Sequence, residues 1–216
     1  RLKLAMSLDG RTAMASGESQ WITGPAARAD VQVLRARSSA IITGADTVMT
    51  DHARLTVRAD VLPLDDEQHA LALSRAPVRI MIDGRLRVPT DMAFFQAGPV
   101  WVVTYQTPPA NTEQIEYIQV PERHGHVDLH AVLIELARRG INELMVEAGP
   151  QLAGAFMQAQ LVDELYIYMA AMLLGSKAQP LVQLPIDLMA DAVQLDIVEM
   201  RALAKDWRII ARPVWA

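Results

Sequence analysis

The first residues of the chain alternate between apolar side chains and polar or small ones. Apolar residues occupy every second position from Leu2 to Leu8. The positions between them hold polar or small residues, including Lys3 and Ala5. A period of two is typical of a strand that places one face on a core. The pair Asp9-Gly10 then indicates a turn. The pattern therefore predicts a strand that ends in a polar loop.

A different period begins after Thr23-Gly24-Pro25, where proline suits the first turn of a helix. Apolar residues recur at helical spacing from Ala27 to Leu34. The polar residues between them are predicted to form the opposite stripe of this helix; they are Arg28, Gln32 and Arg35. This segment is therefore predicted to be an amphipathic helix.

Short apolar runs and helical stretches alternate along the rest of the chain. We predict strands at 40–43, 78–82, 100–104, 143–147, 165–173, 193–200 and 207–214, and helices at 128–139 and 151–160. Asp128 is expected to cap its helix and Gly140 to end it. Alternating strands and helices favour an α/β fold. The last two strands resemble an antiparallel hairpin, so we expect a mixed sheet in a single domain spanning residues 1–216.

The composition narrows the possible classes of function. The chain has 216 residues, 51% of them hydrophobic, with a formal net charge of -5 and no cysteine. The charge disfavours a nucleic-acid binder. Without cysteine, disulfides, thiolate catalysis and cysteine-ligated zinc are excluded, and a reducing, cytoplasmic compartment is expected. The longest apolar stretch, 165–174, is too short for a membrane span of about 20 residues.

Residues 146–155 predict a strand, a Gly149-Pro150 turn and the start of a helix. The first N–H groups of such a helix have no partner within it and carry partial positive charge, so they can hold an anion. Gly149 would let a ligand approach the backbone closely. An ordinary strand-to-helix connection explains the same pattern, which is neither a dinucleotide fingerprint nor a P-loop. We expect this segment and the polar loop after the first strand to lie side by side in one polar cleft over the sheet. This arrangement favours an enzyme with a nucleotide cofactor.

Several charged residues are candidates for ligand contacts, each with a simpler alternative. Glu147 ends its strand where it can accept hydrogen bonds from a ligand, assist proton transfer or cap the next helix. Lys3 is either a cleft residue or an exposed strand lysine. Arg35, Arg54 and Arg58 suit an anionic substrate, because guanidinium binds phosphate through paired hydrogen bonds. Most arginines, however, only solvate a surface.

Three histidines and one tryptophan carry weaker signals. His124, His126 and His130 lie near Asp128, but this spacing does not establish the convergent geometry of a metal site, so no metal is expected. Trp21 follows a polar loop, where it either stacks on a ligand ring or packs. A nucleophile elbow of the form G-x-S-x-G is absent from the sequence, which disfavours a Ser-His-Asp enzyme.

Four segments resemble one known family. They are 4–11 (LAMSLDGR), 17–23 (GESQWIT), 55–58 (LTVR) and 146–154 (VEAGPQLAG). In this order they are similar to the reductase domain of the bacterial riboflavin-biosynthesis deaminase-reductase, and the similarity covers nearly the whole chain. The resemblance implies a dihydrofolate-reductase-like fold, which is a mixed, mainly parallel sheet flanked by helices.

The resemblance also implies a reaction, a cofactor and partners. The reaction would be NADPH-dependent reduction of the phosphorylated pyrimidine 5-amino-6-(5-phosphoribosylamino)uracil, in which the ribose ring opens and hydride reaches C1′. Family members are expected to form homodimers through this domain. Their other half is a zinc deaminase with a P-C-x-x-C signature, which a chain without cysteine lacks. Because Arg1 lies inside a strand pattern, we expect a piece of a longer product with reductase activity and a deaminase domain linked to it.

The resemblance implies roles for individual residues. Those matching cofactor contacts are Ala5, Trp21, Thr47, Asp51, Gly84, Gly149, Pro150, Gln151, Leu152, Ala153, Gly154 and Ala155. Those matching substrate contacts are Ser19, Arg35, Leu55, Arg58 and Glu147, and those implied in proton handling are Lys3, Asp51 and Glu147. The chain departs from the family pattern at His52-Ala53, where Asp-Pro is usual, and at Gly84, where a serine is often found.

Two alternatives stay open at this point. One is a reductase of the same fold that acts on the diaminopyrimidinone analogue before deamination. The other is a non-catalytic module, in which the altered His52-Ala53 loop has cost activity while nucleotide binding or dimerisation survives.

Overall fold

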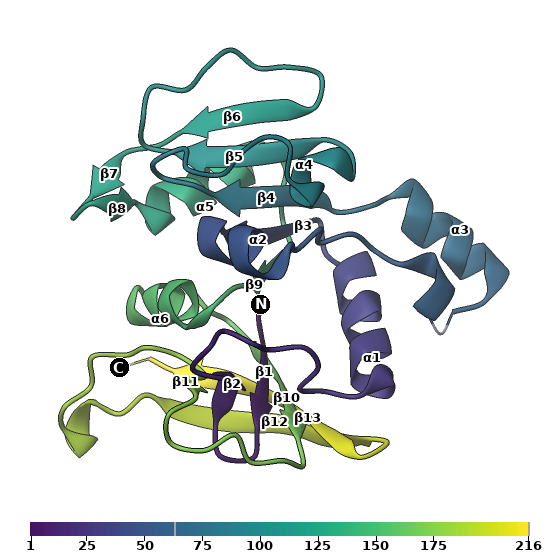
Figure 1. Ribbon diagram of the computed structural model, residues 1–216, viewed down its shortest axis with the longest axis vertical. Helices are drawn as coiled ribbons and strands as arrows, with labels where there is room; N and C mark the ends of the chain where they lie inside the picture. Colours follow the sequence, from purple (N-terminus) through teal and green to yellow (C-terminus); the bar gives the residue numbers. More distant parts are fainter. Residues whose placement is uncertain (63, 216) are drawn as a thin grey trace. The chain divides into compact units, whose positions relative to one another are not determined.

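The computed structural model describes residues 1–62 and 64–215, which form two compact units (Figure 1). The first unit holds Arg1–Val31 and the chain from Val146 onward, so the purple start and the yellow end of the chain in Figure 1 belong to the same unit. The second unit is Gln32–Met145. The single domain expected from the sequence stays a prediction.

The first unit is built on strands in the order β12-β13-β10-β1-β9. In it β9, β1 and β10 are parallel, whereas β13 is antiparallel to β10 and β12 to β13. The bounds are β1 Leu2–Ser7, β9 Leu144–Glu147, β10 Leu165–Ala170, β12 Gln194–Leu203 and β13 Asp206–Val214. Around them lie β2 (Arg11–Ala13) paired with β11 (Gln179–Pro180), helix α6 (Pro150–Gln158) and the turn η2 (Met189–Asp191).

The alternation seen in the sequence sets the two faces of β1. Leu2 and Leu4 are buried, whereas Lys3 and Ala5 on the other face are half-buried. Leu8 is exposed because it lies beyond the end of the strand. The predicted strand at 165–173 ends earlier, at Ala170, because the chain turns there.

The second unit carries the parallel strands β3, β4, β5 and β6, in that order. Their bounds are Ala40–Gly44, Val78–Ile82, Val100–Thr104 and Ile115–Gln119. The other elements here are α2 (Ala45–Asp51), η1 (Ala59–Val61), α3 (Asp66–Ser74), α4 (Ala93–Gln96), β7 (Glu122–Arg123), β8 (His126–Val127) and α5 (Leu129–Arg138). Helix α1 (Pro25–Ala36) begins in the first unit and ends in this one.

Several predictions about these elements are confirmed. The apolar runs at 40–43, 78–82 and 100–104 are buried parallel strands, in which both faces need apolar side chains. The Asp128 carboxylate caps α5, accepting from the N–H groups of His130 and Ala131 at 2.9 and 3.3 Å. Gly140 follows α5 with a φ of 82°. The mixed, mainly parallel sheet with helices and a C-terminal antiparallel pair is thus confirmed as the fold.

The pattern missed α2 and β6. Only Ala45 and Val48 of α2 are buried, too few positions for a helical period to be visible. In β6 the buried residues are Ile115 and Ile118, which do not alternate strictly. Within the described part of the chain, none of the helices is both long enough and apolar enough to pass through a bilayer.

Candidate functional site

The two motifs that are farthest apart in sequence lie on neighbouring strands. β1 and β9 are parallel, and Lys3 stands opposite Glu147 in their register. The Lys3 Nζ atom is 3.9 Å from Glu147 Oε2, and the two side chains are only 19% and 11% exposed. Such a partly desolvated ion pair is sensitive to the loss of either partner. The predicted juxtaposition of the two segments is confirmed.

Helix α6 starts just beyond the carboxyl end of β9, three residues after Glu147. Pro150 is its first residue and Gly149 its N-cap, and no side chain among the described residues caps it. Proline has no N–H, so the first N–H groups of the helix are those of Gln151 and Leu152. They have no partner within the helix and can donate to a ligand. Carboxyl ends of parallel strands and helix N-termini are the usual anion sites of α/β folds. The geometry therefore fits a phosphate at Gly149.

The later part of the predicted cofactor segment is used for packing. Ala153 and Gly154 are buried. A Cβ on Gly154 would lie 1.9 Å from the carbonyl oxygen of Gln183, whose N–H donates to the Pro150 carbonyl at 3.0 Å. The backbone at Gln183 thus crosses α6 directly at Gly154. The cofactor contacts assigned to Ala153, Gly154 and Ala155 stay predictions, but Gly154 already has a structural reason to be glycine.

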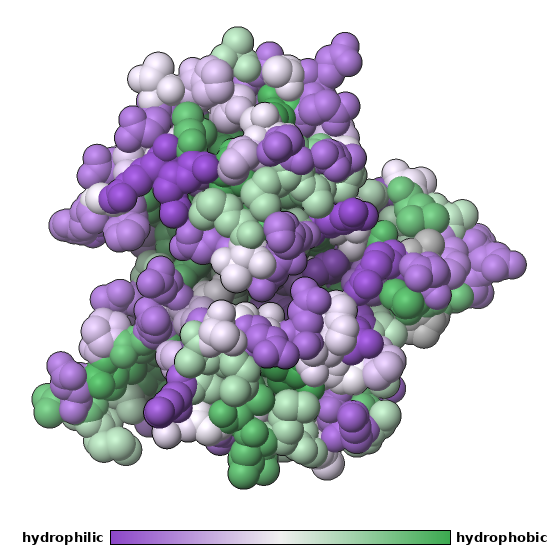
Figure 2. Space-filling model, in the orientation of Figure 1, coloured by the Kyte–Doolittle hydropathy of each residue, from purple (hydrophilic) through white to green (hydrophobic). Residues whose placement is uncertain are grey.

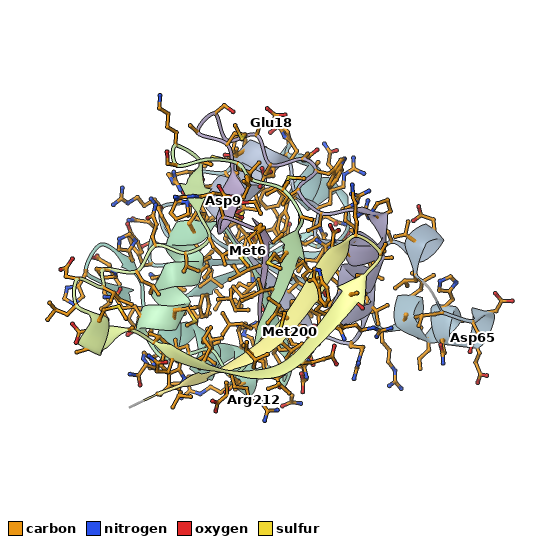
Figure 3. All side chains as sticks on the ribbon, turned by 90° about the horizontal axis from the view of Figure 1, so that it is seen from below. Met6, Asp9, Glu18, Asp65, Met200 and Arg212 are labelled. Atoms are coloured by element: carbon orange, nitrogen blue, oxygen red, sulfur yellow. The ribbon has the colours of Figure 1, made fainter. Side chains whose placement is uncertain are left out.

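The polar loop after β1 is anchored by Asp9. Its carboxylate accepts from the Ser7 hydroxyl and from the N–H groups of Leu174 and Gly175, the latter two at 3.1 and 2.8 Å. The bond to Ser7, followed by that to Leu174, lowers the pKa of Asp9 to about 2. Asp9, labelled in Figure 3, therefore stays ionised at neutral pH and holds the turn after β1 to the loop after β10.

Trp21 is exposed over 61% of its surface, so packing in a core does not explain it. The guanidinium of Arg28 lies over its ring at 4.6 Å from the centroid, a cation–π arrangement. Ser19, two residues earlier, is half-buried. The stacking role predicted for Trp21 remains a prediction, but its ring is at the surface, as that role requires.

A partly buried polar network that the sequence did not reveal lies beside β1. Tyr168 is the register partner of Ala5, and its hydroxyl donates to Asp30 Oδ2 at 2.7 Å. Arg208 Nη1 donates to both Asp30 oxygens at 2.9 Å, and its Nη2 donates to Glu199. Burial, followed by the bond to Asp30, raises the pKa of Tyr168, which therefore stays protonated.

The members of this network come from α1, β10, β12 and β13. Nothing in a single sequence links Asp30 to Arg208, because their positions match only after the strands have paired. The only local signal was the tyrosine itself, since a buried tyrosine needs a hydrogen-bond partner.

The predicted substrate residues of the second unit gather around the segment 54–58, which carries Leu55 and Arg58 and which Arg35 contacts from α1. Arg35 Nη1 donates to the Thr56 carbonyl at 2.9 Å, Leu55 is buried with a φ of 53°, and the Arg58 side chain is exposed. Gln32, which the sequence placed on the polar stripe of α1, is buried. Its Oε1 atom accepts from the Arg58 N–H at 2.9 Å. The stripe prediction was wrong for Gln32 because the amide satisfies a backbone donor inside the fold.

The cofactor and proton-handling residues predicted in this unit are Thr47 and Asp51 on α2, and Gly84 after β4. His52, at the point of departure from the family pattern, ends α2 in the left-handed conformation. A Cβ on Gly84 would lie 2.8 Å from Tyr105 Cε1, so the serine expected there would not fit without a shift. Its contact with a cofactor stays a prediction and would come from backbone.

The predicted residues therefore form two groups. Lys3, Ala5, Glu147 and the start of α6 lie together in the first unit, and Arg35, Leu55 and Arg58 lie together in the second. Among the described histidines, aspartates and glutamates, no group is arranged to hold a metal ion. What is assembled in the first unit is an ion pair next to an uncapped helix N-terminus.

This fold and this pair define a dihydrofolate-reductase-like α/β domain in which a lysine of β1 pairs with the carboxylate that ends β9. The family model described as the RibD C-terminal domain matches residues 1–209 and so runs through both units. The chain belongs to this family. The resemblance drawn from the four motifs is confirmed.

Three relatives show the extent of the match. Over 95% of its length the chain is 47% identical to the riboflavin biosynthesis protein RibD of Escherichia coli, of which it spans 57%. It is 31% identical to a 5-amino-6-(5-phosphoribosylamino)uracil reductase of Buchnera aphidicola and covers 99% of that protein. A solved RibD structure from Acinetobacter baumannii superposes with a TM-score of 0.85 at 36% identity, over the whole chain and 58% of that protein. The chain thus spans little more than half of its RibD relatives.

Proposed function

We propose that this domain reduces the ribosyl group of 5-amino-6-(5-phosphoribosylamino)uracil to the ribitylamino product, using NADPH. The observation that supports this most directly is the Lys3–Glu147 pair beside the start of α6. Membership of the RibD C-terminal domain family supports it as well. The Buchnera relative named for this reaction is matched over nearly its whole length, so its name refers to a chain of this extent.

The residues present fit a dinucleotide cofactor. A reductase of this class draws its hydride from a nicotinamide, which is the chemistry that NADPH would supply here. Its diphosphate would be held by the first turn of α6, which is uncapped by any described side chain and has Gly149 at its N-cap. Trp21, with its exposed ring, and Ala5 on β1 would contribute further contacts. Thr47, Asp51 and the backbone at Gly84 are assigned to the cofactor by resemblance.

Reduction of the ribosyl group consumes a hydride and a proton. The C1′–O4′ bond breaks, O4′ takes up the proton, and the hydride forms the new bond at C1′. The Lys3 ammonium is a suitable donor to O4′ because it carries protons in a partly desolvated site. Glu147 holds that ammonium and would accept from a hydroxyl of the opening sugar. Asp51 is proposed as a further proton-handling group on α2.

The substrate phosphate is assigned to Arg35 and Arg58. Arg35 lies on α1 and donates to the segment 54–58, which carries Arg58. The Arg58 side chain is exposed to solvent. Guanidinium groups bind phosphate through two parallel hydrogen bonds, which fixes orientation as well as charge. Ser19 and Leu55 would complete the substrate contacts. Because Leu55 is buried, its contribution would be to the shape of the binding surface.

An absorbance assay at the NADPH band tests this proposal. With the phosphoribosylaminouracil present, the wild-type chain is expected to oxidise NADPH with a kcat in the range of ordinary enzymes, about 1 to 10³ per second. The diaminopyrimidinone analogue serves as the competing substrate. Faster turnover of the analogue would transfer the activity to a reductase that acts before deamination. Tight NADPH binding without turnover of either pyrimidine would favour a non-catalytic module.

The domain is also proposed to form a homodimer through the face of the edge strand β12 and its neighbour β13 that carries exposed apolar side chains. Leu195, Ile197 and Met200 of this edge strand are exposed, and Trp207 of β13 is exposed on the same face. Figure 3 looks onto this ribbon, with Met200 labelled on it, and Figure 2 shows further hydrophobic surface near η2, where Leu188 and Met189 are exposed. An exposed apolar edge strand is a surface that proteins cover. In contrast, Leu165 and Ile167 of β10 are buried, so core packing accounts for them.

Sedimentation of the wild-type chain is expected to give a dimer, and Met200→Lys is expected to weaken it by at least about tenfold in Kd, since a charge would be buried at the contact. Glu18→Lys is the matched control, because Glu18 is exposed on the loop before α1. A wild-type monomer at micromolar concentration would contradict the dimer. The full-length protein is further proposed to carry a linked deaminase domain, because the chain spans only 57% of its Escherichia coli relative, and to be cytoplasmic.

A further inference from the structure

The segment 54–58 has a backbone conformation that needs support. Leu55 has a φ of 53°, in the left-handed region that residues other than glycine, asparagine and aspartate rarely adopt. Its side chain is buried at 4% exposure. A non-glycine residue keeps such a conformation only where its surroundings fix it. The residues flanking Leu55 show what does so.

Gln32 fixes the segment on its C-terminal side. The Gln32 side chain is 1% exposed, and its Oε1 atom accepts from the Arg58 N–H at 2.9 Å. It reaches the segment from α1, one turn before Arg35, which donates to the Thr56 carbonyl. Gln32 thus holds Arg58 through its backbone N–H, and the Arg58 side chain remains exposed.

Arg79 fixes the segment on its N-terminal side. It lies on β4 with 5% exposure, and its Nη1 atom donates to the Arg54 carbonyl at 3.0 Å and to the Phe94 carbonyl at 2.7 Å. Its Nη2 atom donates to the Gly98 and Pro99 carbonyls. The planar guanidinium therefore donates to several backbone carbonyls at once, which the single ammonium group of a lysine cannot do in the same geometry.

We infer that Gln32 and Arg79 are positioning residues that set the backbone on either side of Leu55 and so aim the Arg58 side chain at the substrate phosphate. Neither residue touches the substrate. They act through Arg58 and Leu55, which the proposed function assigns to substrate binding, and the inference rests on that function for the identity of the ligand. The claim about the backbone stands on the hydrogen bonds alone.

The test compares Gln32→Met with Gln32→Glu. Methionine matches the length of glutamine but accepts no comparable hydrogen bond, whereas glutamate keeps an accepting oxygen in either protonation state. Gln32→Met is expected to raise the exchange rate of the Arg58 amide proton, followed by NMR, by at least about tenfold. It is also expected to raise the KM for the phosphoribosylaminouracil about tenfold, with kcat and the KM for NADPH within about twofold of wild type. Gln32→Glu is expected to keep both the Arg58 exchange rate and the substrate KM near their wild-type values.

The outcomes separate the two ideas. Unchanged Arg58 exchange and unchanged substrate KM in Gln32→Met would overturn the inference while leaving the function in place. An inactive wild type would remove the function, and the Arg58 exchange rate alone would then decide the positioning claim. A fall in kcat together with a rise in the KM for NADPH would mean a general structural role and would also overturn the inference. Arg79→Lys is the second variant, expected to raise the substrate KM in the same selective way.

Discussion

Glu147→Gln is expected to lower the kcat of NADPH oxidation by about 10² to 10⁴-fold, the contribution usual for a positioned proton-transfer group. The amide keeps the size of the side chain but removes the negative charge 3.9 Å from Lys3 Nζ. Since both side chains are mostly buried, solvent does little to replace that charge. The Lys3 ammonium would then lose the partner that orients it toward the opening sugar.

The measurement is steady-state kinetics with the phosphoribosylaminouracil and NADPH, together with NADPH binding followed by fluorescence. NADPH affinity is expected to stay within about threefold, because the phosphate site proposed at α6 would be built from main chain. Glu164→Gln is the matched control: Glu164 is another carboxylate of the first unit, and its ion pairs are with Arg1 and Arg212. A Glu147→Gln enzyme with a kcat within about threefold of wild type would remove Glu147 from the chemistry.

The sequence placed each partner of this pair on a strand, because both strands have a readable pattern. Leu2 and Leu4 fix the face of β1 on which Lys3 lies, and the apolar residues before Glu147 mark the end of β9. That the two strands are neighbours does not follow from either pattern. The polar and glycine-rich ends of the two segments suggested only a shared cleft, and the register that places Lys3 opposite Glu147 came only with the structure.

Buried polar residues were the part that the sequence could not predict. Gln32, Arg79 and the cluster of Tyr168, Asp30 and Arg208 are polar at positions that pack inside the fold. A pattern of apolar and polar residues assigns such positions to the surface. Their burial becomes favourable only when backbone groups or charges from distant segments satisfy them, and that condition is a property of the tertiary structure.

Gly154 shows the converse case, a residue whose place in a motif was read as functional. Its position in the sequence VEAGPQLAG suggested a contact with the cofactor, as for Gly149. The structure places the Gln183 carbonyl oxygen where the Cβ of any other residue would lie. Because glycine serves close approach of ligand and of backbone alike, the sequence cannot separate the two uses.

Gly154→Ala is therefore expected to destabilise the protein by about 3 kcal/mol, at the upper end of the usual cost of overpacking. A Cβ at 1.9 Å from a backbone oxygen cannot be accommodated by turning a side chain, so either α6 or the chain at Gln183 must move. For a protein of this length the melting temperature should fall by roughly 6 to 12 °C. Because α6 then shifts relative to β9, weaker NADPH binding is expected as well.

The control is Gly125→Ala. Gly125 has a φ of 78°, and no described atom lies within 4 Å of the point that a Cβ would occupy, so only the cost of the left-handed conformation applies. That cost is about 1 to 2 kcal/mol, which predicts a smaller fall in melting temperature and unchanged NADPH affinity. Calorimetry of both variants decides the matter. If Gly154→Ala melts no lower than Gly125→Ala, the contact with Gln183 does not limit the packing of α6, and the reason for a glycine at position 154 must be sought in the ligand instead.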